Sequence, residues 1–147
     1  MRTGRSCATM PAMTVTPVLD SPEAIHEHLE IALDPGDRCQ RGVRFVLCDA
    51  DNRVMVHCPV SNIPADVKPD ECANFVSVFA SALAEGDDGG AILVALTRPG
   101  AATVTESERQ WFRATHEVCA SNGVRVLGVH LITPRDHREI HPDDAIF

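Results

Sequence analysis

Apolar positions along this chain follow two patterns, one with spacings of three and four residues and one that is continuous. Spacings of three and four place side chains on one face of a helix, so they predict amphipathic helices. Continuous apolar runs of about four to eight residues predict strands that are buried in a sheet. The expected helices span residues 22–33, 69–84 and 106–122, and the expected strands span residues 43–48, 54–58, 91–96, 124–132 and a short stretch around 137–141.

Residues with strong positional preferences mark the ends of these helices. Ser21 followed by Pro22 is typical of a helix start, because the hydroxyl caps a free backbone amide and proline suits the first helical position. Thr105 and Glu108 match the capping-box pattern at the start of the third helix. Gly123 is a typical residue just after the end of a helix.

The order of the elements predicts one α/β domain with a mixed sheet and flanking helices. Short acidic and amide side chains at residues 49–53 favour a turn, so the first two strands are expected to form a β-hairpin. With 147 residues, of which 44% are hydrophobic, the chain is long enough for one continuous core. We expect a flexible N-terminal segment at residues 1–18 and a single domain at residues 19–147.

Charge and cysteine usage narrow the class of function. The net charge of −8 opposes attraction to nucleic acid and to anionic membranes, both of which favour a positive surface. No segment reaches the roughly 20 apolar residues that span a bilayer, so no membrane association is expected. The six cysteines are dispersed without tight pairing, which predicts reduced thiols and a cytoplasmic location.

The expected central strand ends in a polar loop, residues 96–100. Arg98 projects from this strand end beside Thr97 and near the start of the next helix, where backbone amides attract anions. Arg98 and Thr97 are therefore candidates for binding an anion or the carboxylate of a partner. An ordinary solvated arginine is the alternative.

Three strings of the sequence, in this order, resemble the RadC-like branch of the JAB/MPN metallopeptidase fold. The resemblance covers residues 41–133. It is carried by VRFVLCDADNRVMVHCPVS, similar to the opening hairpin of that family, by KPDECANFVSVFASALAEGDDGGAILV, similar to its helix and buried strand, and by TESERQWFRATHEVCASNGVRVLGVHLIT, similar to its next helix and strand. The resemblance implies a cytidine-deaminase-like arrangement in three layers, with a central sheet and flanking helices.

The resemblance also implies where a catalytic zinc ion would lie, and the chain lacks its ligands. In the family, a His-x-His-Pro segment and a later aspartate hold the zinc, and an upstream glutamate activates the bound water. Aligned on Pro99, the two histidine positions fall at Leu96 and Arg98, which cannot replace imidazoles. The aspartate falls at or near Glu108, whose expected role is in the capping box, and the glutamate falls near Arg41, which cannot act as a base at neutral pH. We therefore expect no zinc hydrolysis, no bound metal and no cofactor at these degenerate positions.

A metal site elsewhere is the alternative raised by the seven histidines. His57 and Cys58 are adjacent in a strand and so point to opposite faces, and His26 and His28 are two apart on a helix and diverge. Cysteine nucleophiles are also not expected, because most of the cysteines lie in apolar patterns typical of inert thiols. Solvated imidazoles are the expectation for three histidines near the C-terminus, His130, His137 and His141.

These observations lead to two hypotheses. The first is a noncatalytic JAB/MPN-like domain that serves as a protein-binding or assembly module, with a protein partner or a second copy of the chain as the implied partner. The alternative is an enzyme or ligand-binding domain that uses Arg98, Thr97 and Glu108 to bind a small anionic substrate without zinc.

Overall fold

The computed structural model describes residues 17–86 and 89–145, so most of the predicted flexible segment 1–18 lies outside the described residues. The helices and strands that we predicted are all present, with small shifts in their bounds. In chain order the elements are α1 (Pro22–Ala32), α2 (Pro35–Arg38), β1 (Gly42–Cys48), β2 (Val54–Ser61), α3 (Pro69–Ala84), β3 (Ala91–Thr97), α4 (Glu106–Asn122), β4 (Arg125–Ile132), β5 (His137–Glu139) and a final 3-10 turn, η2 (Pro142–Ala145).

The five strands form one mixed sheet in the order β2-β1-β3-β4-β5. β1 is antiparallel to both β2 and β3, which confirms the predicted hairpin. β3 and β4 are parallel, and α4 makes the crossover between them. β5 is short and pairs antiparallel with the end of β4. The mixed α+β class expected from the sequence is therefore present.

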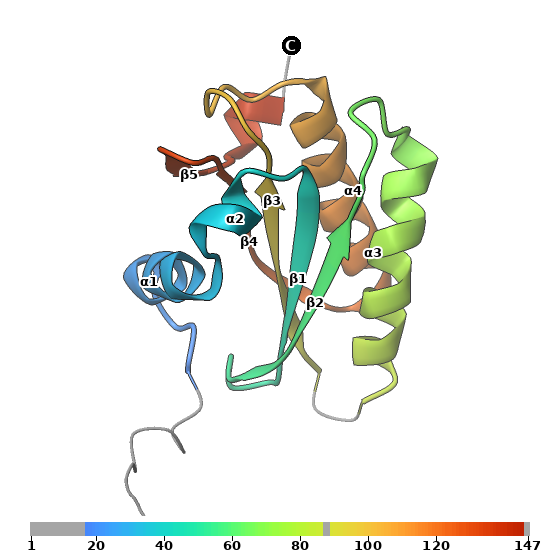
Figure 1. The fold of residues 1–147 in the computed structure, drawn as a ribbon. Helices are drawn as coiled ribbons and strands as arrows, with labels where there is room; N and C mark the ends of the chain where they lie inside the picture. Colours follow the sequence, from blue (N-terminus) through green and yellow to red (C-terminus); the bar gives the residue numbers. More distant parts are fainter. Residues whose placement is uncertain (1–16, 87–88, 146–147) are drawn as a thin grey trace, which may run out of the picture.

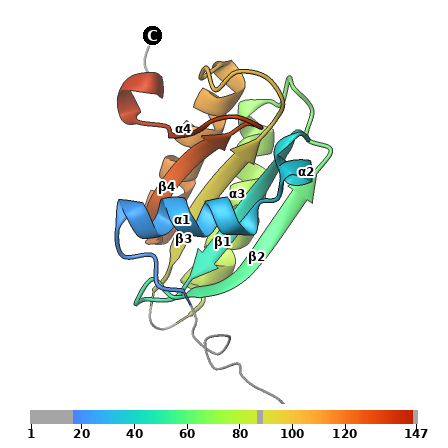
Figure 2. The same ribbon diagram turned by 60° about the vertical axis from the view of Figure 1, so that its left-hand side comes forward.

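Helices cover both faces of this sheet. α3 and α4 lie side by side on one face, and α1 lies across the other (Figures 1 and 2). Each face has its own group of buried apolar side chains, one under α3 and α4 and the other under α1. The sheet is thus the middle of three layers.

The alternation of side chains along β3 explains why both layers are needed. All seven residues of β3 are buried. Ile92, Val94 and Leu96 pack toward α3 and α4, whereas Leu93 and Ala95 pack toward α1. A strand that is apolar on both faces is stable only when both faces are covered.

Local sequence signals fix the ends of the long helices as predicted. The Ser21 Oγ accepts a hydrogen bond of 3.1 Å from the backbone N–H of Ala24, which caps α1. Gly123 ends α4 with φ of +69°, a left-handed conformation that glycine adopts without steric cost.

The one-turn helix α2 was not predicted, because Asp34-Pro35-Gly36 was interpreted only as the end of the first helix. The same residues also start a new turn. The Asp34 Oδ1 accepts from the Asp37 N–H at 2.8 Å, and the Asp37 Oδ2 accepts from the Asp34 N–H at 3.1 Å. This reciprocal capping stabilises a helical turn too short to show a hydrophobic period.

The chain just before α1 contacts the hairpin at the lower end of the sheet. The backbone N–H of Val54 donates to Pro17 O at 2.9 Å, and Val18 forms a β-bridge with Arg53. Among the described helices, none combines the length and the apolar character needed to cross a bilayer.

Packing of α1 on the sheet yields a prediction with a matched control on the same helix. Leu29 is fully buried, whereas Ile31 is 85% exposed. Leu29→Ala is expected to lower the free energy of unfolding by about 2–5 kcal/mol, because it removes buried methyl groups and leaves a cavity. Ile31→Ala is expected to change that free energy by less than about 0.5 kcal/mol. Urea denaturation of both variants would measure this, and equal losses would contradict the burial of this face of α1.

Candidate functional site

The predicted site lies at the carboxyl end of β3, where the chain turns toward α4. Arg98 is the first residue after the strand and is only 8% exposed. All five of its side-chain N–H groups point at acceptors in the loop and in α4. The acceptors are Glu108 Oε2 at 3.1 Å, Glu108 Oε1 at 3.3 Å, Pro99 O at 3.2 Å, Ala101 O at 2.8 Å and Thr103 O at 2.7 Å.

Glu108 is the buried partner of Arg98. It is 2% exposed and also accepts hydrogen bonds from the backbone N–H of Thr105 at 2.8 Å and from the Thr105 hydroxyl at 2.6 Å. Burial alone raises the pKa of Glu108, but hydrogen bonds from Arg98 and Thr105 and the charge of Arg98 outweigh it. The pKa therefore lies below its ordinary value of 4.5, and the carboxylate is ionised at neutral pH.

The capping role expected for Glu108 is present, and the ion pair with Arg98 adds to it. The carboxylate joins the start of α4 to the end of β3, which are ten residues apart in sequence. Capping could be predicted from the spacing of Thr105 and Glu108. The ion pair could not, because the sequence does not show how the loop folds back.

Three of the positions aligned by the resemblance line one small hollow. They are Arg41, Leu96 and Glu108, and the volume of the hollow is about 10 Å³. A hollow of about this size is at the lower limit for a single water molecule. This hollow is therefore too small for a substrate beside Leu96 and Glu108.

Thr97 also lines this hollow, but its hydroxyl takes no part in the hydrogen bonds between Arg98 and Glu108. It donates to Gln40 O at 2.8 Å, which ties the end of β3 to the connection before β1. The side chains of Thr97 and Arg98, which we grouped as a candidate anion site, therefore bond to different partners.

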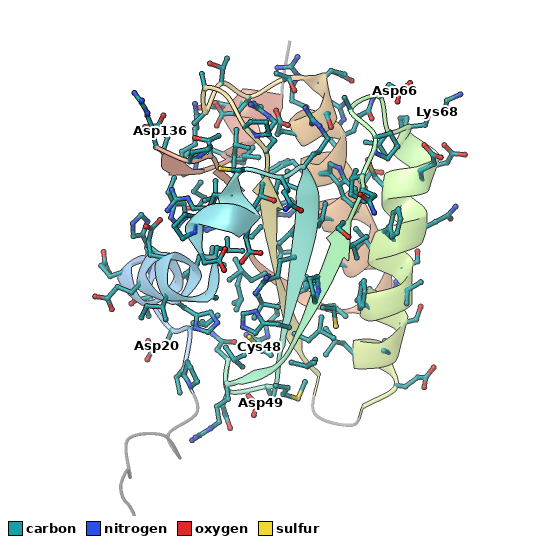
Figure 3. All side chains as sticks on the ribbon, in the orientation of Figure 1. Asp20, Cys48, Asp49, Asp66, Lys68 and Asp136 are labelled. Carbon is teal, nitrogen blue, oxygen red and sulfur yellow. The ribbon has the colours of Figure 1, made fainter. Side chains whose placement is uncertain are left out.

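A second group of polar side chains lies between α1 and β5. The His137 Nδ1 lies 2.7 Å from Glu30 Oε2, and its Nε2 lies 2.9 Å from His130 Nδ1. The His26 ring stacks on the His137 ring with 4.0 Å between centroids and an interplanar angle of 11°. Asp136, labelled in Figure 3, lies just before β5 and next to His137 in the sequence. We name the residues His26, Glu30, His130 and His137 the histidine cluster.

The expectation of solvated histidines near the C-terminus was wrong for two of them. His130 is 5% exposed, and the side chain of His137 is 4% exposed. Burial and the neighbouring His137, His26 and His141 lower the pKa of His130 to about 3. Burial also lowers the pKa of His137, although the hydrogen bond with Glu30 opposes this shift. Both rings are therefore mainly neutral at neutral pH and offer nitrogen lone pairs.

Glu30 is held in place by Arg38. The Arg38 Nη1 donates to Glu30 Oε1 at 3.2 Å, and its Nε and Nη2 donate to Thr133 O and Asp136 O at 2.7 and 3.0 Å. Burial raises the pKa of Glu30, but the hydrogen bonds from His137 and Arg38 outweigh it, so the net pKa is lowered. The carboxylate is thus ionised, with one oxygen toward Arg38 and the other toward His137.

The i and i+4 spacing of His26 and Glu30 was the only sequence signal for this cluster. Residues four apart share a helix face, but the sequence does not reveal that β5 returns beside β4 and brings His137 to that face. His57 and Cys58 do point to opposite faces, as predicted. His57 contacts His28 of α1 at 2.9 Å between their Nε2 atoms, whereas Cys58 packs on the core under α3 and α4.

Three buried cysteines have the inert character predicted for them. Burial raises the pKa of the Cys48 and Cys119 thiols to about 11 and that of the Cys72 thiol to about 12. Thiols with such pKa values are protonated at neutral pH and are poor nucleophiles. Comparisons with known proteins add no candidate chemistry, because neither a family model nor a curated protein matches this chain.

The buried ion pair yields a second prediction. Glu108→Ala is expected to lower the free energy of unfolding by about 3–5 kcal/mol, because it leaves the Arg98 charge buried without a partner. Glu106→Ala is the matched control on the same helix turn. Glu106 forms ion pairs with Arg109 and Arg113, but its side chain is 53% exposed, so a much smaller loss is expected. Urea denaturation measures both, and similar losses would contradict the special role of Glu108.

The lowered pKa of Glu108 yields a prediction for pH. Because its folded pKa lies below the unfolded value, the carboxylate contributes its full stabilisation above the unfolded pKa and loses it as pH falls through the folded pKa. The gap in unfolding free energy between the natural chain and Glu108→Gln should therefore stay constant from neutral pH down to about 4.5 and narrow below that pH. Urea denaturation across this range would show it, and a gap that is constant with pH would contradict it.

Proposed function

We propose that this chain is a noncatalytic, RadC-like JAB/MPN domain that acts as a protein-binding or assembly module. The three layers and the mixed sheet support this fold assignment, and so does the meeting of Arg41, Leu96 and Glu108 at one hollow. The observation that carries the proposal is the Arg98–Glu108 ion pair. Its two members stand at positions 98 and 108, where the resemblance implies zinc ligands.

The ion pair is incompatible with a zinc ion bound at positions 98 and 108. Arg98 brings a fixed positive charge to a place that would need neutral imidazole ligands. Glu108, the one carboxylate at these positions, already accepts four hydrogen bonds. A metal or a substrate would have to break this network and enlarge a hollow of about 10 Å³.

The alternative, binding of a small anion by Arg98, meets the same obstacle. Every N–H group of the guanidinium already donates to an oxygen within the chain. An anion would gain its hydrogen bonds only by taking them from the loop carbonyls and from Glu108. The geometry therefore favours a framework role for Arg98 over ligand recognition.

A second copy of the chain is the partner that the surface fits best. β2 is an edge strand, and its eight residues, VMVHCPVS, contain no acidic or basic side chain apart from a histidine. Edge strands of monomers are usually protected by charge. Met55 and Val56 of β2 are 55% and 44% exposed.

Two β2 strands could pair antiparallel about a two-fold axis, because such an interface uses the same surface on both copies. In a chain with a net charge of −8, an uncharged edge is where two copies approach with least repulsion. Pro59 has no N–H, so the pairing would use residues 54–58. We place this assembly in the cytoplasm, where the thiols stay reduced.

Self-association is tested by a charge at the β2 edge. We expect the natural chain to sediment as a dimer in analytical ultracentrifugation. Met55→Lys should shift it to a monomer, because the two lysines would be diagonal neighbours on the same face of the paired strands and would repel each other. Ile31→Lys makes the same charge change on exposed α1 and should leave the dimer intact.

A natural chain that stays monomeric at every concentration its solubility allows would contradict the dimer. A dimer that persists in Met55→Lys would contradict the assignment to β2. Purified protein that hydrolyses peptide bonds in a manner abolished by Glu108→Gln would contradict the noncatalytic proposal itself.

A further inference from the structure

We propose that α1 and β5 form a binding site for a divalent first-row transition ion such as Zn²⁺, with His26, Glu30 and His137 as its protein ligands. This site is distinct from the Arg98–Glu108 position, and the proposal does not depend on the assembly role. It rests on the spacing of ligand atoms, on their orientation by neighbours and on their access to solvent.

The ligand atoms are already close together. One nitrogen of His26, one of His137 and a carboxylate oxygen of Glu30 all lie within 4.8 Å of one another. In a tetrahedral site with bonds of about 2.1 Å, ligand atoms are about 3.4 Å apart. His137 Nδ1 and Glu30 Oε2, 2.7 Å apart, must therefore separate slightly, and the nitrogen of His26 must adjust to both.

Binding one ion requires the His26 ring to move relative to the His137 ring. His26 is exposed, and its only described ring contact is the stack on His137. Parallel stacked rings direct their lone pairs in parallel, so His26 must tilt to bind the same ion as His137. His137 itself is fixed by burial and by its contacts on both ring nitrogens.

His130 supplies the outer contact that a metal-bound histidine normally has. A histidine that binds a metal through one nitrogen usually donates the N–H of the other nitrogen to an acceptor. His137 Nδ1 faces Glu30, and His137 Nε2 lies 2.9 Å from Nδ1 of the buried His130. A metal at Nδ1 would displace to solvent the proton that Nδ1 donates to the Glu30 carboxylate. The ring would then carry its proton on Nε2 and donate it to His130 Nδ1.

Arg38 orients the carboxylate of Glu30, as His130 orients the ring of His137. Its bond to Glu30 Oε1 leaves Oε2 facing His137, and its bonds to Thr133 O and Asp136 O anchor it to the turn before β5. The positive charge of Arg38 opposes the ion, while the ionised Glu30 attracts it. The donor set of two imidazoles and one carboxylate suits Zn²⁺ and its neighbours better than Ca²⁺ or Mg²⁺, which prefer oxygen alone.

The site offers an open coordination position. Three protein ligands leave at least one position of a tetrahedral ion for water or another group. His26 and Glu30 are exposed, so this position faces solvent and the ion can exchange. The ion would also join α1 to β5, two elements far apart in sequence.

His28 and His57 provide a matched control. These two rings also meet between α1 and the sheet, with 2.9 Å between their Nε2 atoms, but among the residues that the structure describes no carboxylate completes a set of three ligands there. If zinc simply bound any pair of histidines, this pair would bind it as well. His28→Asn should therefore leave zinc affinity unchanged.

The experiment is a titration of chelator-treated full-length protein with Zn²⁺ against a chromophoric competitor, together with thermal denaturation. We expect one Zn²⁺ per chain and a higher melting temperature in its presence. His26→Ala and Glu30→Gln should each weaken zinc affinity by more than about tenfold, the least that even outer contacts are worth. Both variants change exposed side chains, and circular dichroism would show that they fold.

The proposal is overturned if the natural chain binds no zinc, if both ligand variants keep full affinity, or if His28→Asn weakens binding as much as they do. Glu108→Gln separates this site from the other proposal. Zinc binding that is lost in Glu108→Gln but kept in His26→Ala would place the ion at the end of β3 and would contradict both proposals.

Discussion

Burial of β3 on both faces is the constraint on which the rest of the structure depends. Its seven residues have no exposed side, so α3 and α4 must cover one face of the sheet and α1 the other. The aromatic contacts follow from this need, since Phe45 on the neighbouring strand packs against Phe79 of α3 and Trp111 of α4. The Arg98–Glu108 ion pair accordingly lies at the end of β3, and the histidine cluster lies between α1 and β5.

The end of β3 shows how a polar group is kept in such an interior. A buried arginine is costly unless a carboxylate and further acceptors surround it. Arg98 meets this condition by binding Glu108 and three carbonyls of the loop that follows it. The loop is thus wrapped around the guanidinium, and the start of α4 is fixed relative to β3. This ion pair, which in our proposal takes the place of a metal site, also joins the end of β3 to the start of α4.

The face under α1 has a different character, because it collects imidazoles. Five of the seven histidines lie on α1 or on the sheet beneath it, and they are His26, His28, His57, His130 and His137. Close packing lowers the pKa of the buried rings and keeps them neutral. One face of the sheet therefore has a rigid ion pair at its end, while the other has neutral nitrogen ligands near solvent.

The sequence by itself determined the helices, the hairpin, the buried strand and the helix caps, because these depend on residues within a few positions of one another. Ser21, Gly123 and the capping pair of Thr105 and Glu108 act within one helical turn. Tertiary structure decided the partners of Arg98 and the meeting of His137 with Glu30, which are 107 residues apart. Contacts between residues so far apart depend on the conformation of the loops and on the order of the strands in the sheet. The spacing of neighbouring residues in the sequence determines neither of these. The sequence showed leucine and arginine at positions 96 and 98, and only the folded chain brought scattered histidines together.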